Sequence, residues 1–343
     1  MAVRVPQFSR NVLLERLLNR LNSEIVRLPD DDYDAKSRFK HPLVFLVGCP
    51  RSGSTLMLQW LASSGKFAFP DNFMSRFYKA PFVALLIQDM LFNPAYQFRN
   101  EFSDFNVQTS DFASVLGKTS GSLSVNEFYY FWRNYLPASC EYPSAEEMQR
   151  FQLRNARFEI SRILDYQNRP FVCKGLLFNH VLPEIASFFP EAVFINIERD
   201  PFFTAQSLLQ ARETYWGERN SWYSFAIPEK QSLLSKNPLE QVAGQVLLTK
   251  EAVKRGLARI SPGRQLTVAY EELCDSPKKV WKKIMPLLSL DCSKQSLHYS
   301  GPDGYENGNF LRFSVQEREE LCTYLGKFTR DMTHKKKVFE DAI

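Results

Sequence analysis

A short apolar run that leads directly into a glycine- and serine-containing turn constrains the fold more than any other feature of the sequence. Leu43 to Val47 are all apolar and lie between Pro42 and Gly48, and residues 48–55 read Gly-Cys-Pro-Arg-Ser-Gly-Ser-Thr. A continuous apolar run of this length is typical of a strand buried on both faces of a parallel sheet. Because the turn is followed by a predicted helix over residues 55–64, it predicts a loop whose backbone N–H groups point at a bound anion.

The residue types in this loop narrow the choice of anion. The spacing is that of the phosphate loop of nucleotide hydrolases, except that Ser54 stands where that motif has its lysine. Without the lysine, the β- and γ-phosphates of a triphosphate are hard to stabilise. Arg51 instead offers a planar fork of donors that suits phosphate or sulfate oxygens and stays charged. The loop therefore predicts an anionic nucleotide other than a triphosphate.

Three further strands alternate with helices along the chain. The predicted strands cover residues 171–174, 192–197 and 265–269, and predicted helices cover residues 182–189, 201–212, 239–260 and 277–288. This alternation predicts an α/β fold, a three-layer sandwich with a central parallel sheet of the P-loop nucleotide-binding type. We expect one domain over residues 1–343, with a helical extension over residues 1–40 and a helical and irregular insertion over residues 66–168. A lysine run at 335–337 is interpreted as a solvated tail.

Charge and cysteine usage exclude several classes of protein. The formal charge of +5 suits an anionic ligand but is too small to indicate nucleic-acid binding. The six cysteines are scattered, without a CxxC pair or a histidine at ligand spacing, which predicts free thiols and no metal site. No stretch has the pattern of a signal peptide or a membrane-spanning helix, so we expect a cytoplasmic protein.

A second anion-binding element is predicted at the end of the third strand. Arg199 lies at the carboxyl end of that strand, where open α/β sheets bind their ligands. Ser207 follows eight residues later, about two turns into the next helix, and can offer a hydroxyl to the same anion.

Together these segments resemble the sulfotransferases that use 3′-phosphoadenosine 5′-phosphosulfate (PAPS). Residues 50–56 look like their 5′-phosphosulfate loop, residues 197–207 like their 3′-phosphate element, and residues 268–273 like the strand-end segment whose tyrosine contacts adenine. The order of the segments agrees from about residue 42 to 290. The resemblance implies PAPS as co-substrate without a metal, held by Arg51, Ser52, Gly53, Ser54, Thr55, Arg199, Ser207 and Tyr270.

The chain departs from the family pattern at several positions. Leu56 stands where some members have an aromatic residue that stacks on adenine, and Leu176 stands where cytosolic members have a histidine. Residues 301–308 occupy the region of the basic loop that closes over the 3′-phosphate in cytosolic members, but they contain no lysine or arginine. The resemblance therefore leaves open which loop closes over that phosphate.

Sulfuryl transfer needs charge stabilisation at the leaving oxygen and a base for the acceptor hydroxyl. Arg51 and Lys174 are the predicted charge-stabilising residues, because Lys174 ends the second strand, where the family often has a lysine near the sulfonate. His180 is the first candidate for the base because of its position six residues after Lys174. Asp71 and Glu127 are alternatives, because carbohydrate-acting members often use a carboxylate. The sequence does not decide between them.

The leading hypothesis is a PAPS-dependent sulfotransferase that acts on a hydroxylated acceptor, a carbohydrate or a glycolipid, and the latter would bring the enzyme to a membrane surface. Residues 1–40 and 66–168 match nothing specific and are predicted to hold the acceptor. Two alternatives stay open at this point. One is a P-loop nucleotide kinase, which the missing lysine argues against, and the other is a non-catalytic nucleotide-binding module of the same fold.

Overall fold

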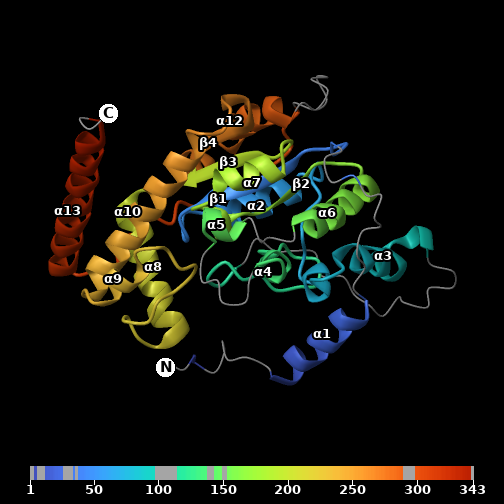
Figure 1. The fold of residues 1–343 in the computed structure, drawn as a ribbon, viewed down its shortest axis with the longest axis horizontal. Coiled ribbons are helices and arrows are strands. Elements are labelled where there is room, and N and C mark those ends of the chain that lie inside the picture. The colour runs from blue at the N-terminus through green and yellow to red at the C-terminus, as the bar shows by residue number, and fades with distance from the viewer. Residues whose placement is uncertain are drawn as a thin grey trace.

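The computed structural model describes residues 4–5, 12–25, 34, 38–96, 114–136, 143–148, 153–288 and 298–340. Within these residues the centre of the molecule is a sheet of four parallel strands in the order β2-β1-β3-β4 (Figure 1). The strands are β1 (Leu43–Gly48), β2 (Phe171–Lys174), β3 (Val193–Glu198) and β4 (Gln265–Ala269). All pairs are parallel, so the carboxyl ends of the four strands lie at one edge of the sheet.

Helices cover both faces of the sheet because side chains of β1 alternate between two apolar clusters. Val44 and Leu46 pack in the cluster that contains α2 (Ser54–Ser63), α11 (Tyr270–Asp275) and α12 (Pro277–Ile284). Phe45 packs on the other face, where its ring lies 5.4 Å from Trp132 and 5.6 Å from Phe194, measured between centroids. The predicted α/β architecture with a central parallel sheet is confirmed.

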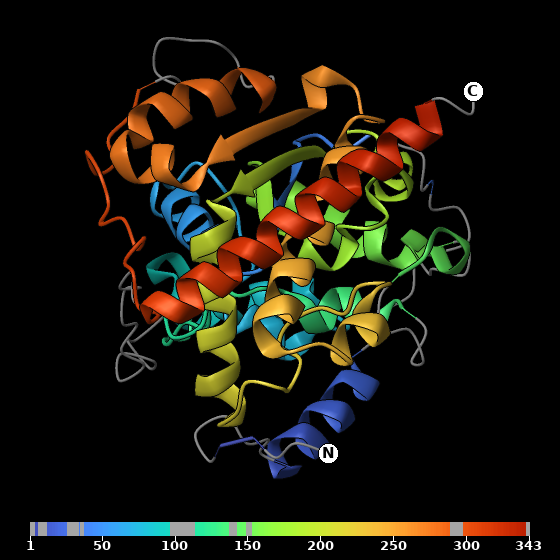
Figure 2. The same cartoon turned by 90° about the vertical axis from the view of Figure 1, so that its left-hand side faces the viewer.

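The remaining helices surround this centre. The face of Phe45 is covered by α4 (Tyr129–Asn134), α6 (Leu153–Gln167) and α7 (Leu182–Phe188). A third apolar cluster joins α8 (Pro201–Trp216), α10 (Pro238–Leu257) and α13 (Val315–Glu340), and Figure 2 shows α13 lying across the other two. Further helices are α1 (Val12–Glu24), α3 (Pro81–Phe92), α5 (Ala145–Met148) and α9 (Lys230–Leu234), with 3-10 turns at Met74–Phe77, Pro94–Tyr96, Leu176–Phe178, Pro262–Arg264 and Met285–Leu288.

The observed elements differ from the predicted ones at β3, at α8 and most clearly at α13. Strand β3 begins and ends one residue later than predicted, and the predicted helix at 201–212 continues to Trp216, where Gly217 ends it with a φ of 77°. The lysine run at 335–337 lies within α13, a helix that the sequence analysis does not predict. The backbone of this run is therefore helical, and its interpretation as a solvated tail stays a prediction.

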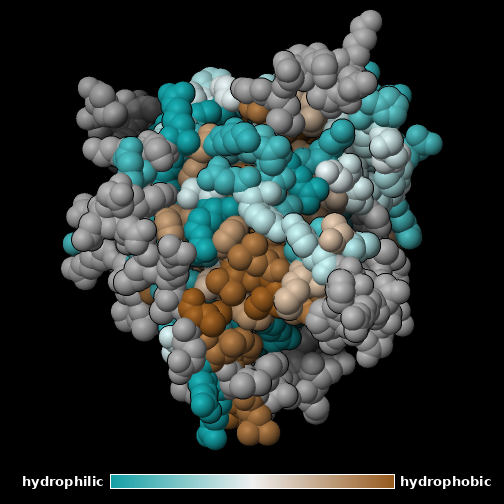
Figure 3. Space-filling view, turned by 90° about the vertical axis from the view of Figure 1, so that its right-hand side faces the viewer, coloured by the Kyte–Doolittle hydropathy of each residue, from teal (hydrophilic) through white to brown (hydrophobic). Residues whose placement is uncertain are grey.

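The surface on the α3 side of the molecule carries an apolar patch (Figure 3). Leu86 and Met90 of α3 are 41% and 47% exposed there. None of the described helices is both long enough and apolar enough to span a bilayer. Of the four cysteines in the described part of the chain, Cys49, Cys173 and Cys274 are buried, Cys322 is exposed, and all four are free thiols. Cys140 and Cys292 lie outside the described residues.

Candidate active site

The loop between β1 and α2 has its shape fixed by contacts on both sides. The Asn179 side chain binds both backbone groups of Gly48. Its Oδ1 accepts from Gly48 N at 3.2 Å, and its Nδ2 donates to Gly48 O at 2.8 Å. Gly48 has a φ of 126°, and a Cβ there would lie 2.5 Å from Ile197 O. Gly53 has a φ of 102°, and a Cβ there would lie 2.4 Å from Tyr270 Cδ2. Both positions therefore need glycine, for backbone conformation and for space.

Two polar side chains at this loop are buried without a partner. Ser52 is 1% exposed and Gln59, one turn beyond Thr55 on α2, is 6% exposed. Within the described residues, neither Ser52 Oγ nor Gln59 Nε2 has a hydrogen-bond partner. A buried polar group without a partner is costly, so the two atoms fit a site that takes up a polar ligand. The backbone N–H groups at the start of α2 favour an anion as that ligand.

The two predicted anion-binding elements lie in direct contact. Arg51 Nε donates to Ser207 Oγ at 3.2 Å, and Arg199 Nη1 donates to Arg51 O at 3.2 Å. Burial lowers the pKa of Arg199, and the neighbouring charge of Arg51 acts in the same direction. The structure thus brings two arginines into contact at the carboxyl ends of β1 and β3, where an anion would be stabilised by both charges.

Residues near Gly308 close this side of the site. Arg199 Nη2 donates to Gly308 O at 2.7 Å, Arg199 Nε donates to Asn309 Oδ1 at 2.7 Å, and Gly308 N donates to Tyr270 Oη at 3.0 Å. The Arg199 guanidinium carbon lies 4.7 Å from the centroid of the Tyr270 ring. The segment therefore covers Arg199 with backbone and amide groups, although residues 301–308 carry no positive charge.

Lys174 forms the other side of the site. Its Nζ donates to Thr55 Oγ1 at 2.7 Å and to Glu127 Oε1 at 2.8 Å. The side chain of Lys174 is 5% exposed, and that of Glu127 is 41% exposed. Gly117 covers the group closely, since a Cβ there would lie 2.9 Å from Thr55 Oγ1. The ammonium group of Lys174 is therefore buried, while the carboxylate of Glu127 reaches solvent.

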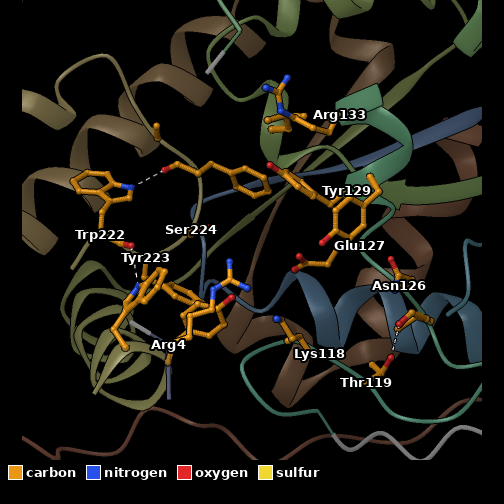
Figure 4. Close-up of a pocket in the computed structure, with 18 of the residues that line it drawn as sticks. Arg4, Lys118, Thr119, Asn126, Glu127, Tyr129, Arg133, Trp222, Tyr223 and Ser224 are labelled. Atoms are coloured by element: carbon orange, nitrogen blue, oxygen red, sulfur yellow. Dashed lines mark hydrogen bonds between the residues drawn. The ribbon is translucent and has the colours of Figure 1, made fainter. Parts of the chain in front are cut away.

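Two cavities meet at this ion pair. The first has a volume of about 310 Å³ and is lined by the β1–α2 loop, Lys174, Arg199 and Tyr270. The second has a volume of about 750 Å³, and seven of its twenty lining residues are aromatic side chains from α4, α8 and the loop after α8 (Figure 4). The lining residues common to both are Gly117, Glu127, Tyr223, Ser224 and Phe225. Among the described residues, Glu127 is the one carboxylate that faces both cavities.

The other two candidate bases, Asp71 and His180, do not lie at the two cavities. Asp71 is 4% exposed, accepts from Met74 N at 2.7 Å and from Gln88 Nε2 at 2.9 Å, and burial raises its pKa to about 6. Burial lowers the pKa of His180, whose charged neighbours are Glu229 and Arg255. In the described part of the chain, neither residue lines either cavity.

Comparison with known proteins identifies this arrangement. The family model described as the sulfotransferase family matches residues 42–294. The chain belongs to the sulfotransferase family. The resemblance drawn from the loop, from the Arg199–Ser207 element and from Tyr270 is therefore confirmed, and the nucleotide-kinase alternative loses its support.

The chain is similar to solved structures of bacterial sulfotransferases. Sulfotransferase STF9 from Mycobacterium avium is 15% identical, with 87% of this chain and 76% of that chain covered and a TM-score of 0.51. A sulfotransferase from Alicyclobacillus acidocaldarius is 13% identical, with 83% of this chain and 92% of that chain covered and a TM-score of 0.46. At such identities the likeness to STF9 shows the fold alone. No curated protein sequence matches the chain.

Several residues of the site were not predicted from the sequence. Gln59 could have been found, because it lies one helical turn after Thr55 and so on the same face of α2. The loop at 223–225 and the contacts of Gly308 with Arg199 have no sequence signal, because each depends on a loop packing against a distant strand end. No group of three or more metal-ligating side chains occurs among the described residues.

Proposed function

We propose that this sulfotransferase transfers the sulfuryl group of PAPS to a hydroxyl of a carbohydrate acceptor. The observation that carries the proposal is the Thr55–Lys174–Glu127 chain of hydrogen bonds at the junction of the two cavities. It connects the loop that suits the nucleotide to a carboxylate that faces the larger cavity. PAPS supplies an activated sulfuryl group on a phosphate leaving group.

The smaller cavity is the proposed nucleotide site. The loop backbone with Arg51, Ser52, Gly53, Ser54 and Thr55 would hold the 5′-phosphosulfate, Arg199 and Ser207 the 3′-phosphate, and Tyr270 the adenine. Support comes from the unpartnered Ser52 hydroxyl and from the contact between Arg199 and the backbone of Arg51. Gln59 Nε2, buried in the same lining, adds a donor for the nucleotide.

The residues at the junction have separate proposed roles. Glu127 is placed to take the proton from an acceptor hydroxyl that enters from the larger cavity. Lys174 and Arg51 are placed to stabilise the negative charge that grows on the leaving oxygen, and this stabilisation is effective because Lys174 is almost fully buried. Glu127 thereby replaces His180 as the proposed base.

The larger cavity is the proposed acceptor site. Residues from within the segment 66–168 line it, including Tyr129 and Tyr130, and the loop after α8 adds Trp222 and Phe225, whose ring centroid lies 5.9 Å from that of Tyr129. Flat aromatic surfaces suit the C–H faces of sugar rings. This lining favours a carbohydrate as the acceptor, and a glycolipid is the alternative. The cytoplasmic location remains a prediction.

The test of the proposal uses Glu127→Gln. With radiolabelled PAPS and a panel of hydroxylated acceptors, we expect the wild-type protein to release adenosine 3′,5′-bisphosphate and label an acceptor. The variant should lose turnover by about 10²–10⁴-fold, because the amide cannot accept the proton. Calorimetry with the bisphosphate should give the same affinity for both proteins.

Glu272→Gln is the matched control, because Glu272 also pairs with a lysine, Lys283, at 2.6 Å but lines neither cavity. It should keep normal turnover. Retention of activity by Glu127→Gln would refute the role of Glu127. A wild-type protein that binds the bisphosphate and PAPS but transfers no sulfuryl group would favour the non-catalytic module.

A further inference from the structure

The segment at residues 306–309, here called the strap, occupies one edge of the Arg199 guanidinium. Arg199 Nη2 donates to Gly308 O and Arg199 Nε donates to Asn309 Oδ1, each at 2.7 Å. Two adjacent guanidinium nitrogens are the fork with which arginine binds two oxygens of a phosphate or a carboxylate. The strap therefore places two uncharged oxygens where two phosphate oxygens would bind.

The rest of the guanidinium is also in contact with the protein. Arg199 Nη1 donates to Arg51 O at 3.2 Å, and the guanidinium carbon lies 4.7 Å from the centroid of the Tyr270 ring. Each of the three guanidinium nitrogens thus donates to an oxygen of the protein. A 3′-phosphate that binds Arg199 through the Nε and Nη2 fork has to replace the two strap oxygens.

Neighbouring side chains orient the strap toward Arg199. Asn309 Nδ2 donates to Glu271 Oε1 at 2.8 Å, which turns Oδ1 of the same amide toward Arg199. Gly308 N donates to Tyr270 Oη at 3.0 Å, and a Cβ at Gly308 would lie 3.2 Å from that hydroxyl oxygen. The strap is therefore closely seated, but it meets the guanidinium with neutral groups.

The strap is anchored separately at each end. Before it, Tyr305 N donates to Cys274 O at 2.8 Å. After it, Gln206 Nε2 donates to Phe310 O at 2.7 Å, and the Gln206 side chain is buried with 3% exposure. The strap itself has no helix or strand structure. It can therefore leave Arg199 while both anchors stay in place.

We propose that the strap is a displaceable substitute for the 3′-phosphate: Gly308 O and Asn309 Oδ1 hold Arg199 in the nucleotide-free enzyme, and a bound 3′-phosphate replaces them. This inference rests on the proposed function, in which Arg199 binds that phosphate. The exchange is favourable because a charged phosphate accepts hydrogen bonds from a guanidinium more strongly than a neutral oxygen does. A nucleotide with only a 3′-hydroxyl leaves the strap in place.

Asn309 is then a residue that sets nucleotide affinity by competing with the nucleotide. Any ligand with a 3′-phosphate binds more weakly by the free energy needed to release the strap, because only the released state is competent to bind it. The bisphosphate product carries the same 3′-phosphate as PAPS. The strap therefore weakens product binding and favours product release, a step that limits turnover in many enzymes.

The first test uses Asn309→Ala, which removes one of the two strap oxygens. By calorimetry, we expect the variant to bind adenosine 3′,5′-bisphosphate about three- to tenfold more tightly than wild type and AMP equally well. Asn220→Ala is the matched control and should keep both affinities, because Asn220 is exposed and lines neither cavity. A bisphosphate affinity of Asn309→Ala equal to or below that of wild type would overturn the inference.

Hydrogen exchange in the wild-type protein provides a second test that needs no variant. The Gly308 amide is hydrogen-bonded to Tyr270 Oη while the strap is in place. Saturating bisphosphate should speed exchange in residues 306–309, whereas AMP should leave it unchanged. Unchanged or slower exchange with the bisphosphate would mean that the strap stays on Arg199 or closes over the phosphate, and the inference would be wrong.

Calorimetry on the wild-type protein distinguishes the two possible failures. If the bisphosphate binds and the two strap tests are negative, this inference fails and the proposed function stands. If neither the bisphosphate nor PAPS binds, the proposed function and this inference fail together.

Discussion

Replacing Lys174 by methionine should separate catalysis from stability. Methionine keeps much of the length and volume of the side chain and removes its charge. Lys174 is 5% exposed, so the substitution also removes the cost of burying an ammonium group. Glu127, which is left without its partner, is 41% exposed and can be hydrated. The Thr55 hydroxyl loses a hydrogen bond worth about 0.5–1.5 kcal/mol. These effects largely offset one another, and we expect the free energy of unfolding to change by no more than about 1 kcal/mol.

The effect on catalysis should be much larger. If Lys174 meets the charge that develops on the leaving oxygen, its loss raises the barrier by about 2.7–4 kcal/mol and lowers kcat about 10²–10³-fold. Initial rates with radiolabelled PAPS at saturation give kcat, and thermal and urea unfolding give stability. Lys283→Met is the matched control, because Lys283 pairs with Glu272 at 2.6 Å outside the site and its loss should change neither quantity. A kcat within threefold of wild type, or a loss explained entirely by unfolding or by KM for PAPS, would refute the reasoning.

Further predictions concern the nucleotide and the buried acid. Arg199→Ala should weaken binding of adenosine 3′,5′-bisphosphate but not of AMP, measured by calorimetry; equal losses for both would remove the 3′-phosphate assignment. Arg51→Lys should lose turnover with little loss of bisphosphate binding, because a point charge cannot replace a bidentate fork; near-normal kcat would contradict this. Gln59→Leu should weaken bisphosphate binding several-fold while raising thermal stability, because it removes a buried unpartnered amide. Burial raises the pKa of Asp71 from 3.8 to about 6 in the folded state, so the folded protein binds this proton more strongly than the unfolded chain does. The free energy of unfolding therefore falls as the pH rises from about 4 to about 6. Asp71→Asn should remove roughly 2–3 kcal/mol of that fall and keep turnover; an inactive variant with normal stability would restore Asp71 as a candidate base.

The strands and the nucleotide loop could be predicted because their signals are local. A continuous apolar run such as Leu43–Val47 buries both faces, and glycines after it mark the turn. The parallel arrangement then brings strand ends together, which is why Arg199 and Ser207, about 150 residues from Arg51 in the sequence, contact it in the structure. Their roles in binding the nucleotide stay predictions.

The sequence did not predict helix α13, and it did not select Glu127 as the base, for different reasons. α13 packs through Leu321, Tyr324, Leu325 and Phe328, whose spacing of three and four is helical but is separated by charged residues on an exposed surface. His180 was favoured because it lies near Lys174 in sequence, yet His180 lines neither cavity, whereas Lys174 lines the smaller one. Glu127, 47 residues from Lys174, reaches it through a loop without periodicity.

This contrast explains why the sequence indicated the donor nucleotide but not the acceptor. The proposed nucleotide site is built from residues at the carboxyl ends of β1, β3 and β4, and topology alone brings those ends to one edge. The proposed acceptor site instead joins Arg4, the turn at Lys118 and the end of α8, which meet only through loop packing. Such loops change sequence without changing the sheet, so a sulfotransferase can keep its donor site and alter its acceptor. A substitution at Lys118 should therefore shift acceptor preference while leaving bisphosphate affinity intact, because Lys118 lines the larger cavity but not the smaller one.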